Sequence, residues 1–178
     1  DRDDLNKRIN NLDRFFDNVE ITHDEEWRRV GTVAGVKIWD SYTADDLKAN
    51  VHEMASQQAV LEVLQEYTPD GNGTYISQAD GQLVFDSDMR EIMREKVLNH
   101  MEAQTKGLIS AQMQKEFADE MLADIRAQYT ADNMPTEEQL QQELQQQIQA
   151  KTEDLFNETT DDLTAGFWGR IKDRKSVV

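Results

Sequence analysis

The stretch ISAQMQKEFADEMLADIRAQY, residues 109–129, decides how the second half of the chain folds. A large apolar residue returns at every fourth position: Ile109, Met113, Phe117, Met121, Ile125 and Tyr129. Because an α-helix has 3.6 residues per turn, residues four apart lie on one face. The residues between them are mostly polar or charged, so the spacing predicts an amphipathic helix with one narrow apolar stripe.

A second stripe precedes this one, and Gly107 lies between the two. An unbroken helix over 87–129 would be about 65 Å long at 1.5 Å per residue. Glycine costs about 1 kcal/mol inside a helix, so a break at Gly107 is the equal alternative. Five of the seven methionines fall on these stripes, where they suit either an adaptable contact surface or an ordinary core. The members of the earlier stripe are Met89, Ile92, Met93, Val97 and Met101.

Another helix is expected after Pro135. Thr136 and Gln139 have the spacing of a capping box, in which each side chain bonds the backbone amide of the other. Seven of the eleven residues from 139 to 149 are glutamine. The narrow apolar seam suits pairing with one neighbouring helix rather than burial in a large core. Its large apolar residues are Leu140, Leu144, Ile148 and Leu155.

Shorter elements are predicted in the first 85 residues. A helix over 3–17 has apolar residues at helical spacing, and residues 27–42 are rich in β-branched and aromatic types. We therefore expect two short strands in 27–42, joined at Ala34-Gly35. Residues 74–77 and 82–85 flank Asp80-Gly81 and predict a second hairpin.

Between the hairpins, a helix is predicted from Thr43 to about Tyr67. Thr43 can cap its start, and Asp45 and Asp46 suit the positive end of its dipole. Pro69 and the glycines after it end the helix. We expect one apolar face made of Leu47, Val51, Met54, Leu61 and Leu64.

These elements predict an α+β fold that is predominantly α-helical, with two small β-hairpins and long amphipathic helices in the C-terminal half. We divide the chain into three regions: 1–85 as a small α+β region with two hairpins, 86–158 as a long helical region, and 159–178 as a short amphipathic basic C-terminal segment.

The composition sets further bounds. No apolar run approaches the roughly 18 residues that span a bilayer, so no transmembrane segment is expected. The absence of cysteine excludes disulfides and thiolate metal sites. No signal peptide is visible, and a cytoplasmic location is favoured. The chain starts at Asp1 without a methionine, so a fragment or a processed product stays open.

Charge is distributed unevenly along the chain. The 19 basic and 36 acidic residues give a net charge of −17, which disfavours direct binding to nucleic acid. The last ten residues nevertheless contain four basic residues against Asp173 alone. The C-terminus therefore has a charge opposite to that of the rest of the chain.

Several motifs come close to known chemistry. Residues 68–79 resemble the middle of an EF-hand loop, with Asp70, Asn72 and Gly73 in place, but Thr68 and Ala79 stand where two anchoring acids belong. A turn into a hairpin explains the same residues. His52-Glu53 and His100-x-Glu102 are halves of two zinc signatures whose remaining ligands are missing. We therefore predict no metal, no cofactor and no catalytic residues.

A partner-binding site is predicted in the C-terminal segment instead. Apolar and aromatic residues stand there beside four basic ones, as in an anchor for a partner groove. The alternative is that the segment packs on its own domain. The predicted contact residues are Phe167, Trp168, Arg170, Ile171, Lys172, Arg174 and Lys175.

The leading hypothesis is a non-enzymatic assembly or interaction protein that forms a homo-oligomer through its helices and docks a protein partner with its basic C-terminal segment. In layout alone, an acidic helical body with a short basic C-terminus is similar to viral scaffolding or assembly proteins. Two alternatives stay open: an acidic inhibitor that occupies a nucleic-acid-binding surface, and an enzyme that uses dispersed carboxylates.

Overall fold

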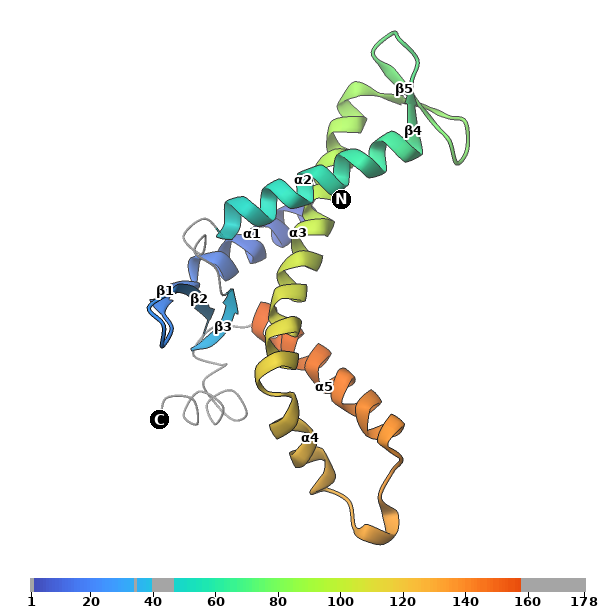
Figure 1. Cartoon of the computed structure of the whole chain (residues 1–178). Coiled ribbons are helices and arrows are strands. Elements are labelled where there is room, and N and C mark those ends of the chain that lie inside the picture. Colours follow the sequence, from blue (N-terminus) through green and yellow to red (C-terminus); the bar gives the residue numbers. More distant parts are fainter. Residues whose placement is uncertain (1, 34, 40–46, 158–178) are drawn as a thin grey trace. The chain divides into compact units, whose positions relative to one another are not determined.

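The computed structural model describes residues 2–33, 35–39 and 47–157 (Figure 1). Within these residues the fold is a predominantly helical α+β fold, as predicted. The helices are α1 (Arg2–Asp17), α2 (Leu47–Glu66), α3 (Asp86–Glu116), α4 (Ala118–Arg126) and α5 (Glu137–Asn157), with a short 3₁₀ helix η2 (Ala131–Asn133). One antiparallel sheet contains β1 (Glu20–His23), β2 (Arg29–Val33) and β3 (Val36–Trp39), and the other contains β4 (Tyr67–Pro69), β5 (Thr74–Ser77) and β6 (Leu83–Phe85).

The chain forms two compact units, each built from two separate stretches of sequence. Unit 1 is formed by the described residues of Asp1–Asp13 and Asp46–Thr105, and unit 2 by those of Arg14–Asp45 and Lys106–Val178. Unit 1 contains α2, most of α1, the first part of α3 and the sheet β4–β6. Unit 2 contains the sheet β1–β3, the end of α3, α4 and α5. The division into regions 1–85, 86–158 and 159–178 stays a prediction.

The prediction that the stripe continues to Tyr129 is wrong, because α4 ends at Arg126 and Tyr129 is only partly buried, with its hydroxyl donating to Glu143 at 2.9 Å. The stripe over residues 109–125 forms the core of unit 2, as its spacing predicted. Each of its five large apolar side chains is at most 3% exposed, and so are the four of the α5 seam. Four of the five stripe methionines, Met89, Met101, Met113 and Met121, are buried, and Met93 is partly buried. The methionine stripe therefore serves ordinary cores.

The helix that carries the stripe is interrupted at Phe117, ten residues beyond Gly107. α3 passes through Gly107 without a break, and Phe117 leaves the helical conformation with φ −123° and ψ −4°. The Phe117 amide still bonds the Met113 carbonyl at 2.8 Å, and the Met121 amide bonds the Phe117 carbonyl at 2.9 Å. The stripe therefore keeps its face across the junction, because the four-residue bonding pattern continues.

α5 runs antiparallel to α4 and to the end of α3. Gln145 bonds Gln114 at 2.8 Å, and Arg126 forms an ion pair with Glu137 at 2.7 Å. The predicted capping box is present: the Thr136 amide bonds Gln139 Oε1 at 3.0 Å, and the Gln139 amide bonds Thr136 Oγ1 at 3.2 Å. The α5 seam is thus buried within one chain, so it no longer argues for an oligomer, and the homo-oligomer stays a prediction.

Both predicted hairpins are present, and each carries a third strand that the sequence did not predict. β2 pairs with β3 and β5 with β6, and the additional strands β1 and β4 lie at the sheet edges. β1 is four residues long with one apolar residue, Ile21, and β4 contains Pro69. Proline removes a ladder hydrogen bond and is tolerated at an edge, which explains why β4 does not read as a strand.

The predicted apolar face of α2 is wrong in part. Leu47 and Val51 are buried, but the buried face continues through Ala55, Ala59 and Val63. Met54, Leu61 and Leu64 are exposed instead. Alanine lets neighbouring elements approach closely, so the small residues face the core of unit 1 and the larger ones lie on the opposite side. α2 ends at Glu66 as predicted, whereas Thr43, Asp45 and Asp46 lie outside the described residues.

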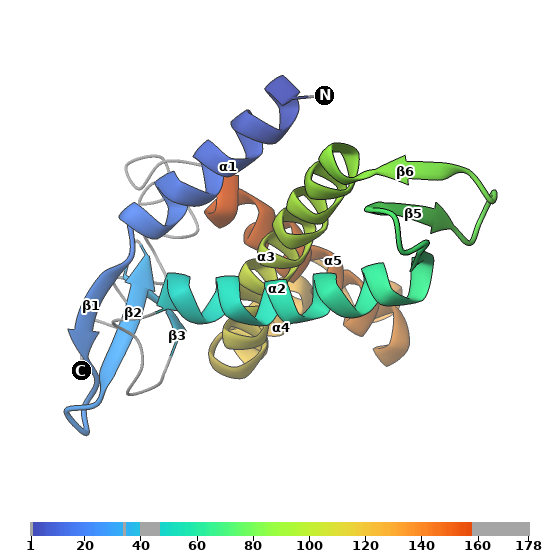
Figure 2. The ribbon, with the colours of Figure 1, turned by 90° about the horizontal axis from the view of Figure 1, so that it is seen from above.

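Unit 1 joins its sheet to its helices at one end. In Figure 2 the β4–β6 sheet lies where α2 ends and α3 begins. The sheet β4–β6 therefore directly follows α2 in the sequence. None of the described helices is long and apolar enough to cross a membrane, in agreement with the composition.

Candidate interaction site

The partner-binding residues predicted from the sequence lie outside the described residues, which end at Asn157. These are Phe167, Trp168, Arg170, Ile171, Lys172, Arg174 and Lys175.

The loop that resembles part of an EF-hand is a turn stabilised by one carboxylate. Asp70 accepts hydrogen bonds from the amides of Asn72 at 2.9 Å and Thr74 at 3.3 Å, and from the Thr74 hydroxyl. The Thr74 hydroxyl, followed by the Asn72 amide, holds the pKa of Asp70 below its ordinary value. Gly71 and Gly73 have positive φ, as a tight turn requires. Within the described residues, no group of three acidic or histidine side chains is arranged to hold a metal.

The histidines of the two partial zinc motifs lie in different surroundings. His52 is exposed on α2, whereas His100 on α3 lies 2.5 Å from the Glu62 carboxylate. That hydrogen bond holds the pKa of Glu62 below its ordinary value. Lys96 bridges Glu66 at 2.6 Å and Glu62 at 3.3 Å, and its pKa is raised, chiefly by Glu66. This cluster fixes α2 to α3 within unit 1 and explains both perturbed groups without catalysis.

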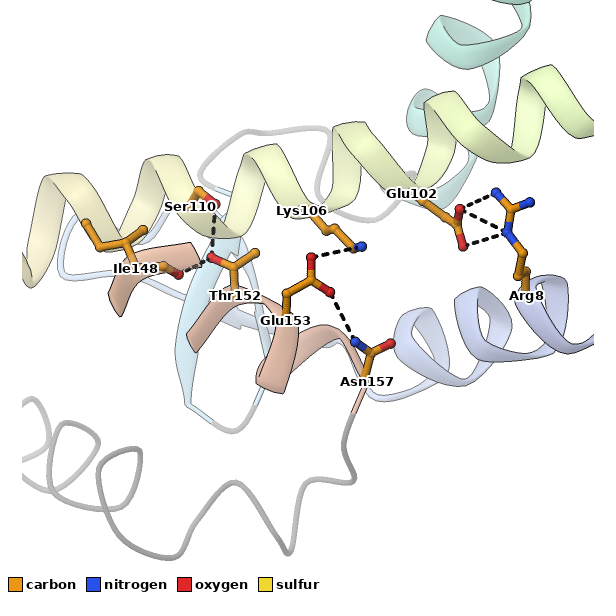
Figure 3. A network of polar contacts seen from close by, with 8 residues as sticks. All are labelled: Arg8, Glu102, Lys106, Ser110, Ile148, Thr152, Glu153 and Asn157. Carbon is orange, nitrogen blue, oxygen red and sulfur yellow. Dashed lines mark hydrogen bonds and ion pairs between the residues drawn. The ribbon is translucent and has the colours of Figure 1, made fainter. Parts of the chain in front are cut away.

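A second ion pair fixes α1 to α3 in unit 1. The Arg8 guanidinium donates to the Glu102 carboxylate, with Nη2 at 2.5 Å and Nε at 3.2 Å (Figure 3). Nη2 also donates to Asn99 Oδ1 at 2.5 Å. Glu102, the acid of the second partial zinc motif, is therefore committed to a structural contact.

Unit 2 contains a buried polar contact where α5 meets α3. Thr152 Oγ1 donates to the Ile148 carbonyl at 2.7 Å and lies 2.9 Å from Ser110 Oγ (Figure 3). Beside it, Lys106 pairs with Glu153 at 3.0 Å and lies 5.1 Å from the centre of the Phe156 ring. Every buried hydroxyl here has a partner, so this contact stabilises the helix pair and offers no free group for chemistry.

The α2 outer face is the first of two exposed apolar surfaces in unit 1. Its apolar side chains are between 46% and 63% exposed, although each is large enough to stabilise a core. Every exposed position between 54 and 65 is uncharged, in a chain with 31% charged residues. We define the α2 outer face as Met54, Gln57, Gln58, Val60, Leu61, Leu64 and Gln65.

The second exposed surface lies on the sheet that follows α2. Ile76 pairs with Leu83, and Thr74 pairs with Phe85, so alternation places these side chains on one face. Ile76, Leu83 and Phe85 are 38–60% exposed. We call Ile76, Leu83 and Phe85 the sheet outer face. Contiguous exposed apolar side chains of this kind mark interaction sites more often than scattered single ones.

An exposed tryptophan stands out in unit 2. Trp27, in the β1–β2 turn, has φ 62° and is 81% exposed. Asp24 fixes the turn, because its carboxylate accepts from the amides of Glu26 and Arg28, both at 2.9 Å. A left-handed non-glycine residue costs of order 1–3 kcal/mol and is often found at functional positions. The turn therefore holds an aromatic side chain out to solvent.

Sequence reasoning missed the α2 outer face because it placed the exposed and buried apolar residues on one stripe. The signal was present: Leu47, Val51, Ala55, Ala59 and Val63 repeat every four residues, apart from Met54, Leu61 and Leu64. Comparison of the chain with protein-family models, with curated proteins and with solved structures found no match. The assignment of function therefore rests on the two units themselves.

Proposed function

We propose that this chain is a non-enzymatic assembly or interaction protein that self-associates through the α2 outer face and contacts a further partner through its basic C-terminal segment. The observation that carries the proposal is the α2 outer face, where large apolar side chains are exposed along an uncharged helix surface. Burying this apolar area against a partner would lower the free energy by roughly 25 cal/mol per Å².

A second copy is the occupant that the charge distribution favours. Two chains of net charge −17 repel each other over most of their surfaces. The polar members of the α2 outer face are glutamines, and the exposed acid Glu53 lies at its N-terminal end. In a two-fold contact the same face meets itself, so apolar side chains and glutamines meet over most of the contact. Met54, Leu61 and Leu64 follow the seven- and three-residue steps of a helix–helix seam.

The expected association is weak. The apolar part of the α2 outer face comprises four side chains on one helix, less than a standard interface of about 1,600 Å² contains. The sheet outer face adds three more apolar side chains in the same unit. A contact of this size belongs with transient interfaces, so we expect an equilibrium between monomer and dimer rather than a permanent dimer.

The test is the native mass measured by sedimentation equilibrium from the low micromolar to the millimolar range. The mass should rise from 20.6 kDa toward twice that value with concentration. Leu61→Glu with Leu64→Glu should hold the protein at the monomer mass, because two carboxylates would then face each other. Gln141→Glu with Gln142→Glu on the exposed side of α5 adds the same charge and should leave the equilibrium nearly unchanged. A monomer at every concentration, or equal effects of both double variants, would refute the α2 contact.

The C-terminal contact needs its own test. Deletion of residues 163–178 should abolish capture of the partner from extracts of the source cell while leaving helicity and melting temperature nearly unchanged. Trp168→Ala should weaken capture at every salt concentration, since buried aromatic area dominates such contacts. Glutamine at the four basic positions should weaken it more at low salt, because exposed charges are screened within about 10 Å at 0.1 M. A lower melting temperature with intact capture would assign the segment to the domain itself.

A further inference from the structure

A cavity of about 350 Å³ lies in unit 1, between α1, α2 and the first part of α3. Its volume is within the range of small-molecule sites, which run from about 300 to 1,000 Å³. Among the residues that the structure describes, the apolar wall is aliphatic: Ile9, Leu12, Val97, Leu98 and Met101. The described lining also contains four ionisable residues: Asp13, Lys48, His52 and Arg94.

The ionisable lining has the opposite character to the rest of the chain. Two permanent cations and a histidine face one acid, in a chain whose acidic residues outnumber its basic ones by 36 to 19. Lys48 and Asp13 pair with each other at 2.6 Å, which leaves Arg94 and His52. Both are exposed, and neither forms a hydrogen bond or ion pair with another residue in the part of the chain that the structure describes. Two nitrogen donors therefore stand available beside an aliphatic cavity.

The basic character continues along α1 and α3. An adjoining depression shares Ile9 and Arg94 with the cavity, and its described lining adds two arginines and one acid: Arg2, Arg90 and Glu91. Arg90 is already paired with Asp86 at 2.8 Å, so it differs from Arg94 in its availability. This difference supplies a matched control, because both arginines are exposed on the same helix.

We propose that the cavity binds an amphipathic anion, with an aliphatic chain against Leu12, Val97 and Met101 and a carboxylate on Arg94 and His52. The guanidinium presents two parallel N–H groups that match a carboxylate, and an imidazole N–H adds a third donor. The described apolar wall consists of aliphatic side chains, which suit an alkyl chain. The proposal is independent of self-association, because it uses none of the α2 outer face.

Binding can be measured by calorimetry on the full chain with decanoate as the probe. Decanol and decylammonium, which have the same chain length, isolate the contribution of the head group. We expect decanoate to bind at least tenfold more tightly than either, and affinity to rise about fourfold per added methylene until the cavity is filled. Equal affinity for decanoate and decanol, or the absence of saturable decanoate binding, would overturn the proposal.

Variants locate the site. Arg94→Gln should weaken decanoate binding at least tenfold and leave decanol binding unchanged, whereas Arg90→Gln should change neither. Val97→Phe should remove binding of both probes by filling the cavity. Should Val97→Phe fail to fold by circular dichroism, the Arg94→Gln and Arg90→Gln pair still decides, because both positions are exposed. Equal effects of the two arginine variants would exclude the cavity as the site.

A vesicle experiment distinguishes two sources of the ligand, a membrane lipid and a dissolved aliphatic acid. Cosedimentation with phosphatidylglycerol vesicles that is lost in Arg94→Gln would assign the site to an anionic membrane lipid. Decanoate binding without cosedimentation would assign it to a dissolved aliphatic acid. Both assignments require saturable decanoate binding, and its absence refutes the proposal whatever the vesicles show.

Discussion

The two units use apolar residues in different ways. In unit 2, the stripe on α3 and α4 and the seam on α5 are almost fully buried within one chain. In unit 1, α2 has apolar side chains on two opposite faces, and only one face is buried. Seven of the ten large apolar side chains that are exposed among the described residues belong to unit 1.

This difference shows which unit exposes apolar surface that a partner could bury. A single apolar stripe at a spacing of four can be buried by one neighbouring helix, and α5 buries the stripe of α3 and α4 in this way. Two apolar faces on one helix need two partners, and the described part of unit 1 supplies one. Among the described residues of unit 2, the exposed large apolar side chains do not form a stripe on one helix: Ile21 is in β1, Trp27 in the turn after β1, and Met134 follows η2. Unit 1 is therefore the better candidate for self-association.

Truncating one apolar residue in each unit should give the largest contrast. Ile125→Ala in unit 2 should lower the free energy of unfolding by about 2–5 kcal/mol, because its side chain is fully buried. Leu64→Ala in unit 1 should change it by less than about 0.5 kcal/mol in dilute solution, since the side chain is exposed. Urea denaturation at low micromolar concentration measures both. Equal costs would mean that the two units do not differ as described.

A smaller effect should confirm which face of α2 is buried. Ala59→Leu inserts a large side chain into a fully buried position and should cost about 1–3 kcal/mol. Gln58→Leu places the same side chain one residue earlier, at an exposed position, and should cost less than about 0.5 kcal/mol. The melting temperatures of the two variants compare them directly. The opposite order would restore the single apolar face expected from the large residues alone.

The start of α5 offers a third contrast, at about 1 kcal/mol. Thr136→Ala removes the side-chain bond to the Gln139 amide and should cost about 0.5–2 kcal/mol. Thr130 precedes η2 without a side-chain capping bond, so Thr130→Ala is the matched control and should cost less. Denaturant midpoints of the two variants separate capping from a general effect of threonine loss. Equal costs would show that the Thr136 bond adds nothing to unit 2.

The elements that could be predicted are those for which the sequence contains a single, unambiguous pattern of residue spacing. The repeat from Ile109 to Ile125 and the Thr136–Gln139 pair each specify a structure locally, and both are confirmed. The face of α2 depended on which of two apolar patterns would find a partner, and only tertiary packing decides that. β1 and β4 are held by their neighbours in the sheets rather than by their own sequences. The exposed faces of unit 1 consist of apolar residues that do not pack against other described elements of the unit, so they could not be located before the packing was known.

The smallest effect concerns the turn between β4 and β5, and it depends on pH. The Thr74 hydroxyl and the Asn72 amide lower the pKa of Asp70 in the folded chain. A lowered folded pKa contributes stability above the unfolded value of about 4 and loses it as pH falls through the folded value. The free energy of unfolding should therefore fall less steeply between about pH 5 and pH 2 in Asp70→Asn than in the unmodified chain. Thr74→Val removes the largest cause of the shift and should give an intermediate slope. Asparagine retains an oxygen that can accept from the Asn72 amide, so the turn itself should persist. Identical slopes in all three proteins would show that the Asp70 bonds add no pH-dependent stability to unit 1.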